Sequence, residues 1–120
     1  MLFNRVAFGK DFFEVYKQVH KEQTGSEISD VRIEVNYDSV VLTGEIVLTS
    51  EEKRYMTSRA GQKLICQVRT GLLEEAKPVI NAKLSSFTGY TVCESFIEIN
   101  LEKRLLQHTF IFRDAYDNAI

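Results

Sequence analysis

The chain has 120 residues, of which 44% are hydrophobic and 27% charged, and its formal net charge is −2. This composition is typical of one globular domain with a single core, and the slightly acidic balance argues against nucleic acid as a main partner. The N-terminal segment lacks the continuous apolar stretch of a secretory signal, and no stretch approaches the roughly 20 apolar residues of a membrane span. We therefore expect a soluble, cytoplasmic protein with no direct membrane insertion.

The first predicted helix covers residues 11–23, where apolar and aromatic side chains recur at the spacing of 3.6 residues per turn. Gly25 follows it as the left-handed residue that commonly closes a helix. Residues 1–9 precede this helix and carry more apolar side chains than a disordered tail normally exposes. We expect them to form an apolar arm that packs on another surface, such as a second subunit.

A β-hairpin is predicted next. Residues 31–37 alternate between apolar and polar side chains, which is typical of a strand with one solvated face, and Tyr37 falls on the apolar side. Asp38 and Ser39 predict a turn, after which residues 40–48 pair antiparallel with the first strand. Near the ends of this second strand, apolar side chains fall on both faces, so the pattern does not fix its pairing register.

A capping box is the sharpest local signal in the chain. The Thr49 hydroxyl can accept from the backbone N–H of Glu52, while the Glu52 carboxylate reaches back to the Thr49 N–H. The pattern predicts a helix that begins at Ser50. This helix should be short, because residues 57–61 offer a break and a second helix start.

A long central helix is predicted from the apolar residues that recur at steps of three and four between Leu64 and Phe87. Pro78 lacks a backbone N–H and clashes with the Glu74 carbonyl. We therefore expect either a bend at Pro78 or two helices that meet near Lys77.

The second half of the chain repeats the organisation of the first. Gly89 closes the central helix as Gly25 closes the first one, and residues 92–100 and 106–113 form a second predicted hairpin with a polar turn. The two Thr-Gly pairs lie about half the chain apart, which indicates two pseudo-repeated αββ units.

These elements predict an α+β fold with a four-stranded, mainly antiparallel sheet made from two β-hairpins, with the helices on one face. A single domain should cover residues 10–113, between the arm of residues 1–9 and a C-terminal tail of residues 114–120. Because such a sheet leaves its second face free, we also expect a homodimer.

No motif for catalysis, metal binding or nucleotide binding accompanies this organisation. His20 and His108 lack the spacing of metal ligands. We expect His20 to be a half-buried helix residue and His108 to be a strand residue, although either could be a metal ligand if the fold brings the two together. Cys66 and Cys93 have no CxxC spacing and are interpreted as two reduced core residues. We therefore expect no catalytic residues, no metal and no cofactor.

A basic group of side chains is a candidate contact for an anion or a partner. The middle helices have a basic character, although neighbouring glutamates partly neutralise it; the basic residues are Lys53, Arg54, Arg59, Lys63 and Arg69. A solvated surface of mixed charge is the simpler interpretation. If an anionic partner exists, we expect these residues and the helix start at Thr49 to contact it.

The sequence LTSEEKRYM, followed by AGQKLICQVRTGLLEEAKPVI and FTGYTV, resembles the MpsC-like family of small bacterial proteins. The resemblance spans about residues 10 to 113. The family is named for a sodium-translocating, membrane-potential-generating system whose other components are membrane proteins. The positions that match the family pattern are mostly caps and helix breaks: Thr24, Gly25, Leu48, Thr49, Glu52, Lys53, Gly61, Arg69, Pro78, Thr88 and Gly89.

The resemblance implies a non-enzymatic accessory or regulatory protein with a protein partner at a membrane complex. The alternative is a sensor of a small anionic ligand, with its site between Thr49, Lys53, Arg69 and the sheet, and an enzyme of unknown reaction ranks third. An accessory protein predicts an exposed apolar face, whereas a sensor predicts a closed polar pocket.

Overall fold

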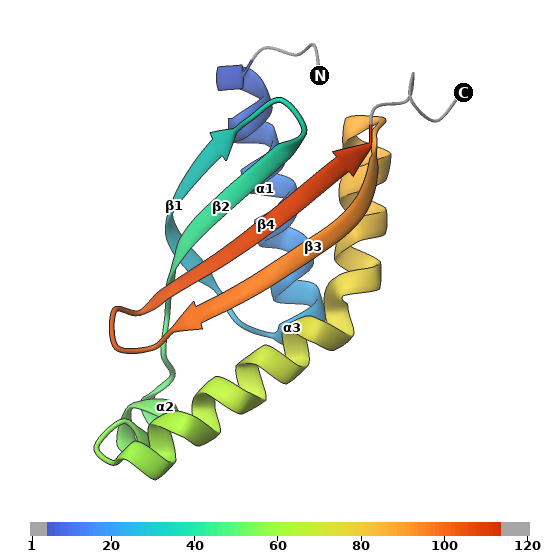
Figure 1. The fold of residues 1–120 in the computed structure, drawn as a ribbon. Coiled ribbons are helices and arrows are strands. Elements are labelled where there is room, and N and C mark those ends of the chain that lie inside the picture. Colours follow the sequence, from blue (N-terminus) through green and yellow to red (C-terminus); the bar gives the residue numbers. More distant parts are fainter. Residues whose placement is uncertain (1–4, 114–120) are drawn as a thin grey trace.

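The computed structural model describes the backbone of residues 5–113 and the side chains of residues 10–29 and 32–113. Its four strands pair antiparallel in the order β1-β2-β4-β3, and α1 and α3 lie on one side of the sheet (Figure 1). The predicted α+β fold is therefore confirmed. The elements are α1 (Arg5–Thr24), β1 (Ile28–Val35), β2 (Ser39–Ile46), α2 (Ser50–Tyr55), α3 (Arg59–Thr88), β3 (Thr91–Asn100) and β4 (Leu105–Arg113).

Helix α1 begins earlier than the predicted start at residue 11, so residues 5–9 of the expected apolar arm are helical. The rest of that arm and the C-terminal tail lie outside the described residues. The helix ends as predicted, because Gly25 has a φ of 74° and its N–H donates to the Lys21 carbonyl at 2.8 Å.

The first hairpin resolves the register that the sequence pattern left open. Val40 of β2 pairs with Val35 of β1, and the even-numbered residues of β2 are buried against the helices. The prediction for Tyr37 was wrong. Strand β1 ends at Val35, and the Asn36 N–H closes the turn by donating to the Ser39 carbonyl at 2.8 Å, so Tyr37 sits at the exposed tip of the hairpin.

The helix start at Ser50 is confirmed, with both hydrogen bonds of the capping box in place. Helix α2 is short, and α3 begins after it at Arg59, where the Ser58 hydroxyl accepts from the Gly61 N–H at 3.0 Å. Helix α3 is one continuous helix that contains Pro78. Figure 1 shows that it changes direction in its yellow part, which includes this proline, so a single bent helix replaces the alternative of two helices.

The core lies between the sheet and the inner sides of α1 and α3. The Phe12 ring packs edge-on against the rings of Phe110 and Phe112, at centroid distances of 5.6 and 6.2 Å. Ile80 and Leu84 complete this layer from the second half of α3. The first half of α3 and the short α2 extend past the end of the sheet (Figure 1), so these two helices contact mainly each other there.

Candidate functional site

A small pocket lies where the end of α1 meets α3 and the sheet. The space inside it is about 10 Å³, which matches one water molecule. Polar side chains line one part of it and aliphatic side chains line the rest. The lining residues are His20, Thr24, Ser26, Ile28, Ile46, Arg69, Leu72, Leu73, Ile99 and Leu106.

Arg69 links this pocket to helix α2. Its guanidinium makes a bidentate contact with the Glu52 carboxylate, with Nε to Oε2 and a terminal nitrogen to Oε1 both at 2.7 Å. The same terminal nitrogen donates to the Val47 carbonyl at 3.0 Å. Because the Arg69 side chain is only 9% exposed and that of Glu52 is 23% exposed, the pair is a partly buried ion pair with strong hydrogen bonds.

Glu52 therefore has two partners at once. Its carboxylate also accepts from the Thr49 N–H at 3.0 Å, while the Glu52 N–H donates to the Thr49 hydroxyl at 3.1 Å. The Arg69 guanidinium holds the pKa of Glu52 below its usual range, and the Thr49 N–H lowers it further against the opposing effect of burial. The capping box thus also orients the carboxylate that fixes Arg69.

Two buried side chains form a hydrogen bond across the core next to this pocket. The Tyr16 hydroxyl lies 3.0 Å from Nδ1 of His108, and the His108 ring stacks on Phe110 at a centroid distance of 4.1 Å. Burial raises the pKa of the Tyr16 hydroxyl far above its usual range. Burial lowers the pKa of His108 to about 3, with smaller contributions from the charges of Lys77 and His20. Both groups are therefore uncharged at neutral pH.

His20 lies beside this pair, with its ring centroid 5.5 Å from that of Tyr16. Burial and the nearby charge of Arg69 lower the pKa of His20 to about 4, so this imidazole is neutral as well. Its Nδ1 is buried and has no hydrogen-bond partner in the part of the chain that the structure describes. A neutral histidine in such a pocket can exchange a hydrogen bond with a small polar molecule.

The predicted contact residues separate into two groups. Lys53 and Arg54 are exposed on α2, whereas Arg69 is buried and directs its hydrogen bonds to Glu52 and Val47 within the chain. Whether any of them contacts an anion or a partner stays a prediction. Among residues 5–113, no group of three or more histidine, cysteine or acidic side chains is arranged to hold a metal ion.

The predicted caps hold, and one cysteine differs from its prediction. Gly89 has a φ of 77° and its N–H donates to the Ser85 carbonyl at 2.9 Å, as expected of a helix cap.

Both cysteines are free, and Cys66 packs against the core. The interpretation of Cys93 as a core residue was wrong, because Cys93 is exposed on the edge strand β3, where the pairing with β4 is irregular between Val92 and Glu94.

His20 is more buried than the predicted half-burial, at 3% exposure, and His108 lies in a strand as predicted and is fully buried, at 0% exposure. A signal for this was available in the local patterns. His20 follows Phe12 and Tyr16 at steps of four, and His108 shares the parity of the buried residue Phe110 in β4. The contact between the two segments could not be read from either pattern.

No helix in the described part of the chain is long and apolar enough to cross a membrane.

Comparison with known proteins gives one match. No curated protein and no solved structure matches the chain significantly. A family model described as "Na+-translocating membrane potential-generating system (MpsC)" matches residues 6–114, which is nearly the whole chain. The protein therefore belongs to the MpsC family.

Proposed function

We propose that this protein is a cytoplasmic, non-enzymatic accessory or regulatory component of a bacterial Na⁺-translocating, membrane-potential-generating system. The match of the family model over residues 6–114 carries the proposal, because its description names such a system. In this role the protein binds a protein subunit of the system and changes that subunit's activity or assembly.

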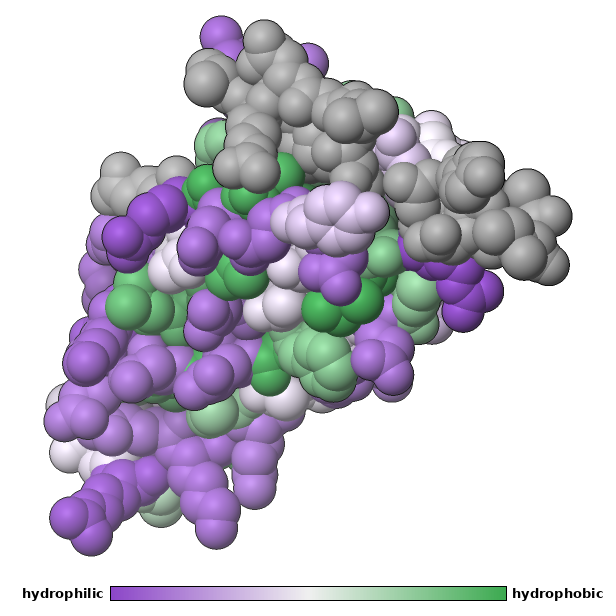
Figure 2. All heavy atoms as spheres, turned by 45° about the horizontal axis from the view of Figure 1, so that its top comes forward, coloured by the Kyte–Doolittle hydropathy of each residue, from purple (hydrophilic) through white to green (hydrophobic). Residues whose placement is uncertain are grey.

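The open face of the sheet supports an interaction role. Phe96 of β3 is 55% exposed and lies opposite Thr109 of β4, which in turn pairs with Val41 of β2. Figure 2 shows hydrophobic residues interspersed with hydrophilic ones on the face of the molecule that it draws. A central exposed aromatic side chain with a polar surround is the usual anatomy of a protein-binding surface.

The predicted partner contacts on α2 fit the same role. Lys53 and Arg54 are exposed on the part of the molecule that extends past the sheet. The Glu52–Arg69 pair holds α2 against α3, so these two cations have a defined position. We expect them to add an electrostatic contribution to partner binding that weakens with salt.

The proposal can be tested by the Na⁺-dependent membrane potential of intact cells, measured with a potential-sensitive dye. Cells that lack the protein should lose most of the potential generated after Na⁺ addition, and the wild-type chain should restore it. Phe96→Glu should fail to restore it because a charge replaces the central apolar contact, whereas the matched control Gln23→Glu, at an exposed position of α1, should succeed. An unchanged potential in cells without the protein would contradict the proposal.

A sensor of a small anionic ligand is the second candidate, because His20 and Arg69 line the same pocket. The space of that pocket suits a molecule of water size, so a metabolite requires the pocket to widen. Native mass spectrometry of gently purified protein distinguishes the two candidates. A retained stoichiometric mass that is lost in His20→Gln would support the sensor, and a ligand-free spectrum would favour the accessory role.

A further inference from the structure

Arg104, in the turn between β3 and β4, has a backbone conformation that a long side chain does not favour. Its φ is 57°, and in the part of the chain that the structure describes it is the only residue other than glycine with a positive φ. Glycine adopts this left-handed region freely, whereas a Cβ atom makes it costly. Residues held in such conformations cluster at binding and active sites.

The fold uses the backbone of Arg104 and not its guanidinium. The Arg104 N–H donates to the Leu101 carbonyl at 3.2 Å, and the Arg104 carbonyl accepts from the Ile46 N–H at 2.8 Å. Glycine could make both bonds equally well. One terminal nitrogen of the guanidinium is buried without a hydrogen-bond partner among the described residues, and none of their ion pairs includes Arg104. Because a partly buried, unpaired cation is unfavourable, this arrangement favours the binding of an anion.

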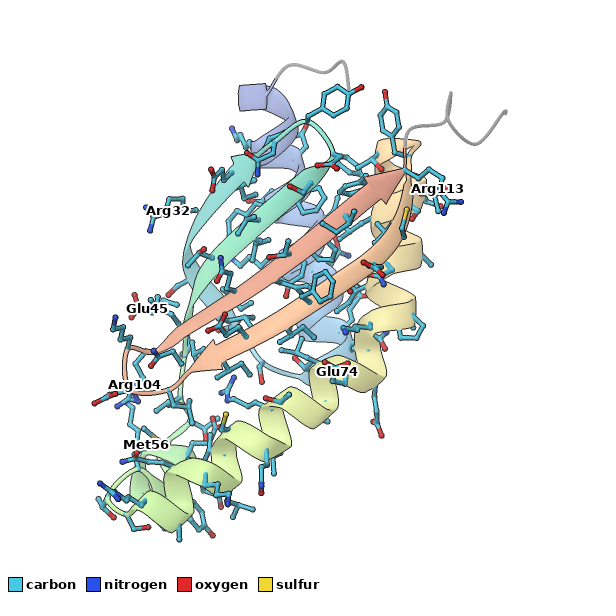
Figure 3. The ribbon with its side chains drawn as sticks, in the orientation of Figure 1. Arg32, Glu45, Met56, Glu74, Arg104 and Arg113 are labelled. Atoms are coloured by element: carbon cyan, nitrogen blue, oxygen red, sulfur yellow. The ribbon has the colours of Figure 1, made fainter. Side chains whose placement is uncertain are left out.

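Other exposed cations lie at the same end of the molecule. The bond to Ile46 holds Arg104 beside the end of β2, four residues before α2 begins at Ser50. Figure 3 shows Arg104 at the turn and Met56 at the end of α2, both at this end of the molecule. The exposed cations of the turn and of α2 are Lys103, Lys53 and Arg54.

The charges of these two segments favour an anion with more than one negative charge. The acidic side chains of the turn and of α2 are Glu51, Glu52 and Glu102. The Glu52 carboxylate already binds Arg69, so the cations outnumber the remaining carboxylates, in a chain whose net charge is −2. A guanidinium binds phosphate through two parallel hydrogen bonds, and a phosphate monoester carries about −1.5 to −2 charges at neutral pH.

We propose that Arg104 anchors a binding site for a phosphate group, and that Lys103, Lys53 and Arg54 supply the surrounding positive charge. This site is distinct from the anion contact predicted at Arg69, because Glu52 and Val47 occupy the Arg69 guanidinium. The phosphate group belongs to a soluble phosphate ester or to a phospholipid head group, since both present the same oxygens to the guanidinium. The site does not depend on the proposed accessory role.

Titration of the isotope-labelled full chain with inorganic phosphate, at constant ionic strength, tests the site by NMR. The backbone amides of the turn should shift saturably, with a dissociation constant on the order of millimolar. Arg104→Gly should raise this constant at least about tenfold, and Arg104→Lys, which keeps the charge but loses the planar fork, should raise it about threefold. The matched control Arg32→Gln removes an exposed cation of β1 and should stay within about twofold of wild type.

Thermal melts separate a binding role of Arg104 from a structural one. Arg104→Gly removes both the backbone strain and the unpaired nitrogen, so its melting temperature should rise by about 3 °C. A lower melting temperature would show that the side chain supports the fold and would overturn the proposal. A titration without saturable shifts, or a wild-type dissociation constant in Arg104→Gly, would overturn it as well.

Flotation with vesicles identifies the source of the phosphate group, using phosphatidylcholine with and without phosphatidic acid. Binding that requires phosphatidic acid and is lost in Arg104→Gly would assign the site to a lipid head group. Phosphate titration at Arg104 without vesicle binding would assign it to a soluble phosphate ester. These measurements are independent of the membrane-potential assay, so either proposal can fail alone.

Discussion

Removing the Glu52 carboxylate should destabilise the protein far more than its partial exposure suggests. Glu52→Ala leaves the Arg69 guanidinium, with a side chain only 9% exposed, without its charged partner. Loss of one partner of a buried pair costs about 3–5 kcal/mol, and the exposure of Glu52 reduces that figure. Loss of half of the capping box adds up to about 1 kcal/mol. We therefore expect the free energy of unfolding to fall by about 3 kcal/mol.

The reverse change should cost less, because the two partners differ in burial. Arg69→Met keeps an apolar side chain of similar length and leaves Glu52 partly solvated and hydrogen-bonded to Thr49. We expect a loss of about 1 kcal/mol for Arg69→Met. The double variant Glu52→Ala/Arg69→Met should be more stable than Glu52→Ala alone, with a coupling energy of about 2 kcal/mol.

Urea unfolding at pH 7, followed by circular dichroism, measures these differences. The largely exposed pair Lys21–Glu27, at 2.9 Å, is the control, and Glu27→Ala should change stability by less than about 0.5 kcal/mol. A loss below about 1 kcal/mol for Glu52→Ala, or a double variant whose loss equals the two single losses combined, would refute the reasoning that a buried, unpaired guanidinium dominates.

Three further predictions concern buried groups and glycines. The unfolded chain has histidine pKa values near 6.5, while those of His20 and His108 are about 4 and about 3 in the fold. Stability should therefore be complete above pH 6.5 and fall by about 1.4 kcal/mol per pH unit for each histidine as pH drops toward 4, and His20→Gln should reduce that slope by one proton in urea melts at several pH values. Gly61→Ala should lower the melting temperature, at a cost of about 2 kcal/mol or more, because an added Cβ collides with the Tyr55 carbonyl. In Gly71→Ala the added Cβ meets open space, so this variant should stabilise α3 by about 1 kcal/mol. Equal changes of the melting temperature in the two variants would contradict this prediction. Tyr16→Phe removes the hydroxyl at Nδ1 of His108 and should cost about 1–2 kcal/mol in urea unfolding, and a neutral result would show that this hydrogen bond adds nothing.

The features that the sequence predicted correctly depend on contacts between neighbours in the chain. Thr49 and Glu52 are three residues apart, so their capping box follows from spacing alone. Gly25 and Gly89 end their helices through bonds to carbonyls four residues earlier. The predicted internal repeat rests on the same local signals and stays a prediction, because similar helix–hairpin units can arise without a repeated sequence.

Tertiary structure alone decided the features that join distant segments. The Arg69–Glu52 pair spans 17 positions and the Tyr16–His108 contact spans 92, so no local pattern indicates either one. Likewise, the pairing of β2 with β1 and β4 decided which of its side chains face the helices, since apolar residues lie on both faces of β2. The sequence by itself determined where α2 begins and where α1 and α3 end, because those capping signals act within one helical turn. The packing of α1, α3 and the sheet determined which polar side chains became buried and therefore changed their pKa values.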